Sequence, residues 1–215
     1  GRVGVEAKPI ELLSVFGGVS FATGKGFHPG GQATKGTFSW SDTNLNGMVS
    51  PEEILPVPGS AATPSQNFDR WALALDAGLT FHTRFGNTKL YGEAFVASNY
   101  DRGYMPADPV TTSIDVRETG IYGALVQDVT KYGLAGFRAA YYDPNADVSE
   151  ERAGEFVPFD QTVLVLSPLV GVQIKDQAKL LFQYDFVNDH LGRDTRGVPT
   201  DVENNGFTVR LQVEL

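Results

Sequence analysis

The chain has 215 residues, of which 41% are hydrophobic, and it carries 26 acidic against 17 basic side chains, for a formal net charge of -9. The mean hydropathy of -0.16, without any run of about 18 apolar residues, excludes a helical membrane protein, and the acidic balance argues against nucleic acid as a partner. The lack of cysteine removes disulfides, thiolate metal sites and cysteine nucleophiles, whereas 24 glycines, 14 phenylalanines and 8 tyrosines favour strands and turns.

The chain opens on a short alternating segment, residues 1–7, in which Val3, Val5 and Ala7 are separated by smaller or polar residues. A short turn is expected directly after it, at residues 8–11. We interpret the segment as the end of an earlier strand, which predicts further strands upstream of this sequence, because bacterial single-chain barrels have even strand numbers. The alternative is an eight-stranded barrel with a short extended amino terminus.

Eight longer segments with a period of two follow, and this period indicates strands. The last is the clearest, with one wholly apolar and one wholly polar face. Most of the segments are about ten residues or longer, which matches the roughly 9–11 residues that a tilted strand needs to cross a bilayer. We expect strands near residues 10–23, 69–83, 88–98, 115–128, 133–142, 160–174, 178–188 and 206–215.

Short and long connections alternate between these strands. This alternation is typical of outer-membrane barrels, which have tight periplasmic turns and long outer loops, and not of β-sandwiches with Greek-key crossovers. A soluble barrel that buries its apolar face inside is the alternative. Aromatic residues near the strand ends, including Tyr91 and Tyr142, are interpreted as interfacial girdles, and ordinary cross-strand aromatic pairing is the alternative. Short turns are expected at 84–88, 129–132 and 175–177, and long loops at 24–68, 99–114, 143–159 and 189–205.

The long loop 24–68 contains a calcium-type sequence at residues 42–53, which fits the pattern D-x-[DN]-x-[DN]-G-x₅-E at every specified position. Calcium takes 6–8 oxygen ligands, and one loop can wrap around it. The flanking residues cannot form paired helices, so the alternative is a polar loop of Asx turns. We expect a structural calcium ion held by Asp42, Asn44, Asn46, the carbonyl of Met48, Ser50 and Glu53, with Gly47 providing the sharp turn.

Other candidate sites are weaker. The three histidines, His28, His82 and His190, have neither metal-ligand nor catalytic spacing, so no catalytic residue is predicted and we do not expect an enzyme. The segment 143–147 is a partial echo of the calcium pattern, without its glycine. A turn with solvated acids is the alternative there.

Charged residues of both signs occupy the polar positions of the expected strands. Charge on this face suits a water-filled lumen, whereas in a narrow barrel the same residues would form a packed salt-bridge network. The acidic excess hints at a preference for cations. The lumen-facing candidates are Asp76, Glu93, Arg138, Lys179, Asp185, Arg210 and Glu214.

The carboxy-terminal part, roughly residues 115–215, resembles Gram-negative outer-membrane porins of the phosphate-selective type. The resemblance rests on Gly136-Phe137-Arg138, Tyr141-Tyr142-Asp143-Pro144, Gln183-Tyr184-Asp185 and Arg210-Leu211-Gln212-Val213, together with a terminal strand that looks like a barrel-assembly signal. That signal typically ends in Phe, whereas this chain ends in Leu215. The resemblance implies a homotrimer of sixteen-stranded barrels, each narrowed by an inward-folded loop. It does not imply phosphate selectivity, because no lysine cluster is visible.

We therefore expect an all-β transmembrane up-and-down barrel in the cell outer membrane, with about eight strands in this chain and lipid against its apolar face. Its expected function is passive diffusion of small hydrophilic solutes or ions. Two alternatives are a small structural or adhesive barrel without a wide pore and a component of an envelope complex that docks through the calcium loop.

Overall fold

The computed structural model describes residues 1–84, 86–100, 107–152, 155–158, 161–174, 178–190, 192–196 and 198–213. The chain is all-β with one short α-helix, and it divides into two compact units. Unit 1 consists of Gly1–Gly24 and Asp69–Leu215, and unit 2 is Lys25–Phe68. The long loop expected at 24–68 thus forms a unit of its own.

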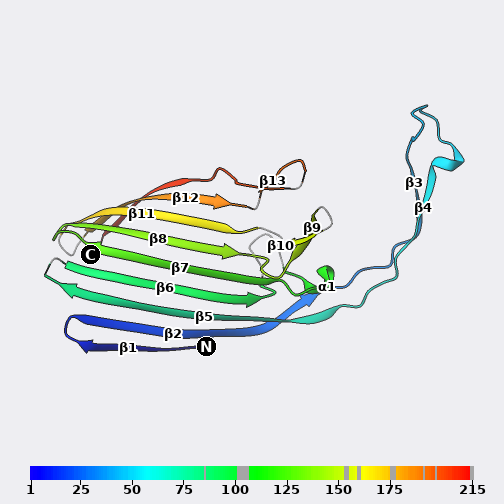
Figure 1. The fold of residues 1–215 in the computed structure, drawn as a ribbon. Helices are drawn as coiled ribbons and strands as arrows, with labels where there is room; N and C mark the ends of the chain where they lie inside the picture. The colour runs from blue at the N-terminus through cyan, green and yellow to red at the C-terminus, as the bar shows by residue number, and fades with distance from the viewer. Residues whose placement is uncertain are drawn as a thin grey trace. The chain divides into compact units, whose positions relative to one another are not determined.

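Unit 1 is built on a nine-stranded antiparallel sheet in which each strand pairs with the sheet strand that follows it in the chain (Figure 1). Among the described residues, the two outermost strands, β1 and β15, are not paired with each other. The strands are β1 (Arg2–Ile10), β2 (Leu13–His28), β5 (Gln66–Thr83), β6 (Gly86–Ser98), β7 (Arg117–Asp128), β8 (Gly133–Asp143), β11 (Val163–Ile174), β12 (Ala178–Asp189) and β15 (Gly206–Val213).

The nine sheet strands coincide with the nine alternating segments of the sequence to within a few residues. The first turn lies at Glu11–Leu12 instead of residues 8–11, because β1 continues through Pro9. Proline is tolerated there since the register of β1 with β2 is irregular between Ala7 and Ile10. The long connections hold short elements that the sequence did not predict: β3 (Thr37–Trp40), η1 (Pro51–Glu53), β4 (Ile54–Val57), α1 (Pro109–Thr112), β9 (Ser149–Arg152), β10 (Glu155–Pro158), β13 (Gly192–Arg193) and β14 (Pro199–Thr200). These elements are too short to show a clear period.

The strand register sorts the sheet into two faces. Residues that pair directly across strands point to the same side, so the row Asp76, Glu93, Tyr122 and Ala140 defines one side, which we call the polar face. The residues that alternate with them define the apolar face. It includes Leu75, Phe81, Leu90, Ile121, Leu125, Phe137, Tyr141, Leu164, Leu166, Val170, Val172, Tyr184, Phe186, Phe207, Val209 and Leu211.

Among the described residues, the apolar face of unit 1 has no charged side chain in the middle of the sheet. Its charged residues Asp69, Arg117 and Asp143 lie at or beside strand ends that adjoin long connections. Large apolar side chains on this face are exposed, for example 57% for Ile121. Burying one such side chain contributes about 1.5–3 kcal/mol, so covering the whole face is worth on the order of tens of kcal/mol. This face therefore requires a cover other than water.

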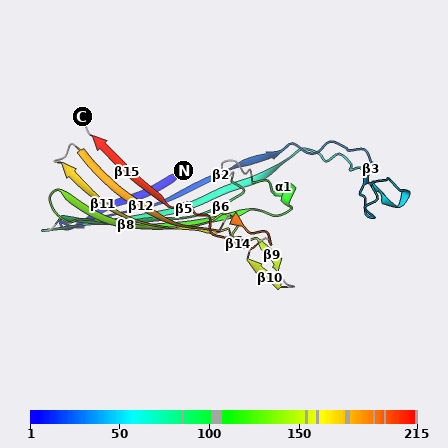
Figure 2. The same cartoon turned by 90° about the horizontal axis from the view of Figure 1, so that it is seen from above.

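The polar face is the more crowded of the two on β7, β8, β11 and β12. Along β11 the apolar-face side chains are exposed, whereas Ser167 and Gly171 on the opposite face are buried. Side chains on the concave side of a curved layer crowd one another, and Figure 2 shows the sheet strands following one another in a single curved layer. This exposure pattern indicates that the polar face is concave, contrary to a soluble barrel with an apolar interior.

Candidate functional site

Six of the seven charged residues expected to face a lumen lie on the polar face. Asp76 and Glu93 pair directly across β5 and β6. Arg138 pairs with Ser167, Lys179 with Gln212, and Arg210 with Leu181. Asp185 lies on the same face of β12 as Lys179 and Leu181, because an even number of residues separates it from each. The seventh residue, Glu214, lies outside the described residues.

Asp185 is the centre of a packed polar cluster on β8, β11 and β12. Its Oδ1 accepts hydrogen bonds from the Ser167 hydroxyl at 2.5 Å and from Gln183 Nε2 at 2.7 Å, and Arg138 Nη2 lies 4.0 Å away. Ser167 is fully buried. The sequence did not single out Ser167, because the neighbouring Pro168 interrupts the alternation there. Among the residues that the structure describes, this cluster contains one ion pair and two hydrogen bonds, all on Asp185.

Asp76 forms an ion pair that the sequence did not predict. Arg2 Nη2 lies 2.7 Å from Asp76 Oδ2, across 74 positions of the chain. Only the apolar members of residues 1–7 carried a signal in the sequence, so the role of Arg2 depends on the pairing of β1 with β2 and of β2 with β5. Glu93 stands directly beside this pair, and its carboxylate has no hydrogen bond or ion pair with any residue in the described part of the chain.

Aromatic side chains accompany the carboxylates on the polar face. Tyr91 and Tyr142, expected in interfacial girdles, both lie on this face. Tyr91 is two residues from Glu93 on β6, and Tyr142 is four residues from Arg138 on β8, so each points to the same side as that charged residue. That part of the girdle interpretation is wrong. The Tyr91 and Tyr122 ring centroids are 6.4 Å apart in an edge-to-face arrangement, and the Tyr142 hydroxyl donates to Glu118 at 2.9 Å.

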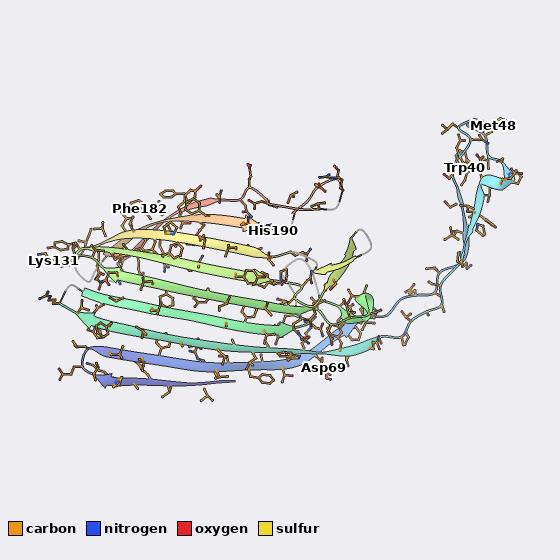
Figure 3. The ribbon with its side chains drawn as sticks, in the orientation of Figure 1. Trp40, Met48, Asp69, Lys131, Phe182 and His190 are labelled. Carbon is orange, nitrogen blue, oxygen red and sulfur yellow. The ribbon has the colours of Figure 1, made fainter. Side chains whose placement is uncertain are left out.

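Unit 2 contains the residues expected to bind calcium, at the tip of the hairpin formed by β3 and β4. Figure 3 labels Trp40 and Met48 at this tip. Asp42 accepts hydrogen bonds from the amides of Asn46 at 3.2 Å and Gly47 at 2.8 Å, and the side chains of Asn44 and Asn46 accept from amides two residues ahead. Gly47 has a φ of +70°, as its expected turn requires.

Glu53 closes this loop with both carboxylate oxygens. Oε1 accepts from the Thr43 amide at 2.9 Å, the Thr43 hydroxyl and the Asn44 amide, and Oε2 accepts from the Ser50 hydroxyl at 2.9 Å and the Ser50 amide. The Ser50 hydroxyl makes the largest contribution to lowering the pKa of Glu53 to about 2, and backbone amides contribute further. The oxygen donors of the loop suit calcium by type, but Glu53 could chelate the ion only by releasing some of these donors.

The other candidate residues form ordinary polar contacts. Within the described residues, no group of three or more His, Cys, Asp or Glu side chains is placed to hold a metal ion. In the segment 143–147, Asp143 accepts from the Asn145 amide at 3.0 Å, and Asp147 pairs with Arg117 at 3.1 Å. His82 Nδ1 lies 2.7 Å from Asn87 Oδ1.

Among the described residues, no helix is long and apolar enough to span a membrane. Comparison of the chain with models of protein families, with curated proteins and with solved structures found no match. The functional argument therefore depends on the two faces of the sheet and on the side chains that they bring together.

Proposed function

We propose that this chain forms part of the wall of a transmembrane β-barrel in an outer membrane, and that the barrel is a passive channel for small hydrophilic solutes or ions. One observation carries the proposal: the register separates an exposed, centrally charge-free apolar face from a crowded face with charges of both signs. Lipid tails would cover the first face without loss of hydrogen bonds, and water would solvate the second.

Strand length and topology support this function. The sheet strands from β2 to β12 have 11 to 18 residues, enough to cross a bilayer at a tilt. The nine strands alternate in direction, so β1 and β15 run the same way. Closing this sheet with antiparallel pairs alone requires an odd number of further strands. A sixteen-stranded barrel, implied by the porin resemblance as the unit of a homotrimer, satisfies this condition.

Channel activity is tested by reconstituting the full-length protein in planar lipid bilayers and measuring single-channel currents. The proposal expects stepwise ohmic conductance, because a water-filled lumen removes the desolvation barrier for ions. A protein that inserts, as shown by protection of its sheet from external protease, yet carries no current would instead be a structural barrel with a closed interior.

A second proposal concerns calcium binding by residues 42–53. It is favoured by the complete sequence match. It is also favoured by the side-chain oxygens of Asp42, Asn44 and Asn46, which all accept hydrogen bonds from backbone amides of the same short loop. Because Glu53 would have to exchange hydrogen bonds for the ion, we expect modest affinity. Isothermal titration of calcium into the wild type and into Asp42→Ala tests it. Equal heats in the two proteins, or no heat in either, would contradict calcium binding by this loop. The loop would then be held only by its Asx turns and by the hydrogen bonds of Glu53.

A further inference from the structure

The centre of the polar face between β5 and β7 holds two adjacent carboxylates. Asp76 and Glu93 are directly paired across strands, where like charges destabilise a sheet. Arg2 lies 2.7 Å from Asp76. Lys89 lies on the same face four residues before Glu93 on β6, and Arg138 on β8 lies 4.0 Å from Asp185. Glu93 itself has no ion-pair partner among the described residues.

Aromatic rings surround Glu93 on the same face. Tyr122, on the neighbouring strand β7, pairs directly with Glu93. Tyr91 and Phe95 stand two residues before and after Glu93 on β6. Tyr91 is 38% exposed and Phe95 36%, although both lie on the face that carries the charges. Exposed rings around a carboxylate offer a cation both a counter-charge and the negative faces of π-systems.

Rings of two polar-face aromatics cover strand glycines. The Phe16 ring lies over Gly78 and the Phe95 ring over Gly120, where each occupies the space that a Cβ would fill. Such covering of strand glycines stabilises sheets. Tyr91 also adjoins Gly78 through its Cβ, and its ring meets that of Tyr122 edge to face at 6.4 Å, beside Glu93.

We propose that Glu93, Tyr91 and Tyr122 form a binding site for an organic monocation, a quaternary or primary ammonium group, on the concave face of the sheet. The Glu93 carboxylate supplies the charge and the two tyrosine rings supply cation–π contacts. The inference rests on the proposed function only in that the polar face must be open to solutes. In a channel the site would raise the local concentration of such cations above that of neutral solutes of equal size.

The test uses choline as the probe and its neutral carbon isostere, 3,3-dimethyl-1-butanol, as the matched control ligand. Binding to the full-length protein in uncharged detergent micelles is measured by saturation-transfer NMR and isothermal titration, with empty micelles as the blank. We expect saturable choline binding and no saturable binding of the neutral isostere. Because the assay requires no current, failure of the channel proposal and failure of this site give different results.

Variants assign the binding to these side chains. Glu93→Gln keeps the shape and removes the charge, and should weaken choline binding at least tenfold. Tyr122→Leu should weaken it several-fold, whereas Tyr122→Phe, which keeps the ring, should not. Asp185→Asn removes a different carboxylate of the same face and should leave affinity unchanged. Arg2→Gln removes the competing cation and should tighten binding.

Each contrary result overturns the proposal. Equal binding of choline and its neutral isostere would indicate apolar adsorption. Equal loss in Glu93→Gln and Asp185→Asn would indicate a diffuse field instead of a site. Displacement of choline by potassium at equal concentration would indicate a site for inorganic cations. Circular dichroism and resistance of the sheet to urea identify any variant that fails to fold. If Glu93→Gln fails to fold, the choline affinities of Tyr122→Phe and Tyr122→Leu still test the site independently.

Discussion

The two faces of the nine-stranded sheet share one backbone, but they differ in what their side chains require. The apolar face carries large exposed residues and, in the part of the chain that the structure describes, has charges only near its ends, whereas the polar face holds ion pairs and a buried serine. An exposed leucine is ordinary, but an exposed face of this extent is not. The surroundings of the sheet can therefore be inferred from the face whose large apolar side chains are exposed.

The largest expected effect comes from placing a charge on the apolar face. Val209→Lys should destabilise the protein in lipid by about 2–4 kcal/mol, because lysine near the bilayer midplane has no water. The matched control is Thr208→Lys, one residue earlier on β15 and on the polar face. Urea unfolding in liposomes measures both variants. Equal destabilisation by the two would mean that both faces of β15 meet the same solvent.

The next effect concerns the cluster around Asp185. Asp185→Ala removes the acceptor of the Ser167 hydroxyl and of the Gln183 amide, which should cost about 1–3 kcal/mol since Ser167 is fully buried. Asp185→Asn keeps one acceptor oxygen and should cost less. Chemical denaturation of both variants provides the measurement. No loss in Asp185→Ala would show that the polar face is open to water at this point.

The loop of unit 2 should respond to acid through Glu53. The pKa of Glu53 is about 2 in the folded protein against an ordinary value of 4.5, so its hydrogen bonds stabilise the loop above pH 4.5. This stabilisation is lost as the pH falls from about 4.5 towards 2. Amide NMR shifts of Asn44 and Gly47 should follow this titration in the wild type and lose it in Glu53→Gln. An identical titration in Glu53→Gln would assign the change to another group.

The smallest effect on stability is expected at Arg2. Its side chain is 62% exposed, so Arg2→Gln should lower the free energy of unfolding by about 1 kcal/mol or less, despite the 2.7 Å contact with Asp76. Unfolding at low and at high salt measures it, and high salt should remove the difference between variant and wild type. A larger, salt-independent loss would mean that this pair is shielded from water.

The strands were predictable and the partners of their charges were not. A period of two marked all nine sheet strands, because an exposed apolar face imposes alternation on every strand that contributes to it. The same alternation put Asp76, Glu93 and Asp185 on one side. It also places Tyr91 beside Glu93, two residues away on the same strand, and the girdle interpretation of Tyr91 did not take this into account.

The pattern at residues 42–53 correctly predicted a turn at Gly47, since a positive φ there is a local requirement of the loop. The five hydrogen bonds accepted by Glu53 were not visible in the pattern, because the same carboxylate at that spacing could face a metal ion or the backbone. Only the arrangement of the whole loop distinguishes these roles.

The sequence by itself determined that this protein is made of long antiparallel strands with one apolar and one polar side, since side-chain direction alternates along any strand. Tertiary structure alone decided which charges meet, placing Arg2 on Asp76, Arg138 near Asp185 and leaving Glu93 between two tyrosines. The physical reason is that contacts across strands depend on register, which the alternation within any one strand does not specify.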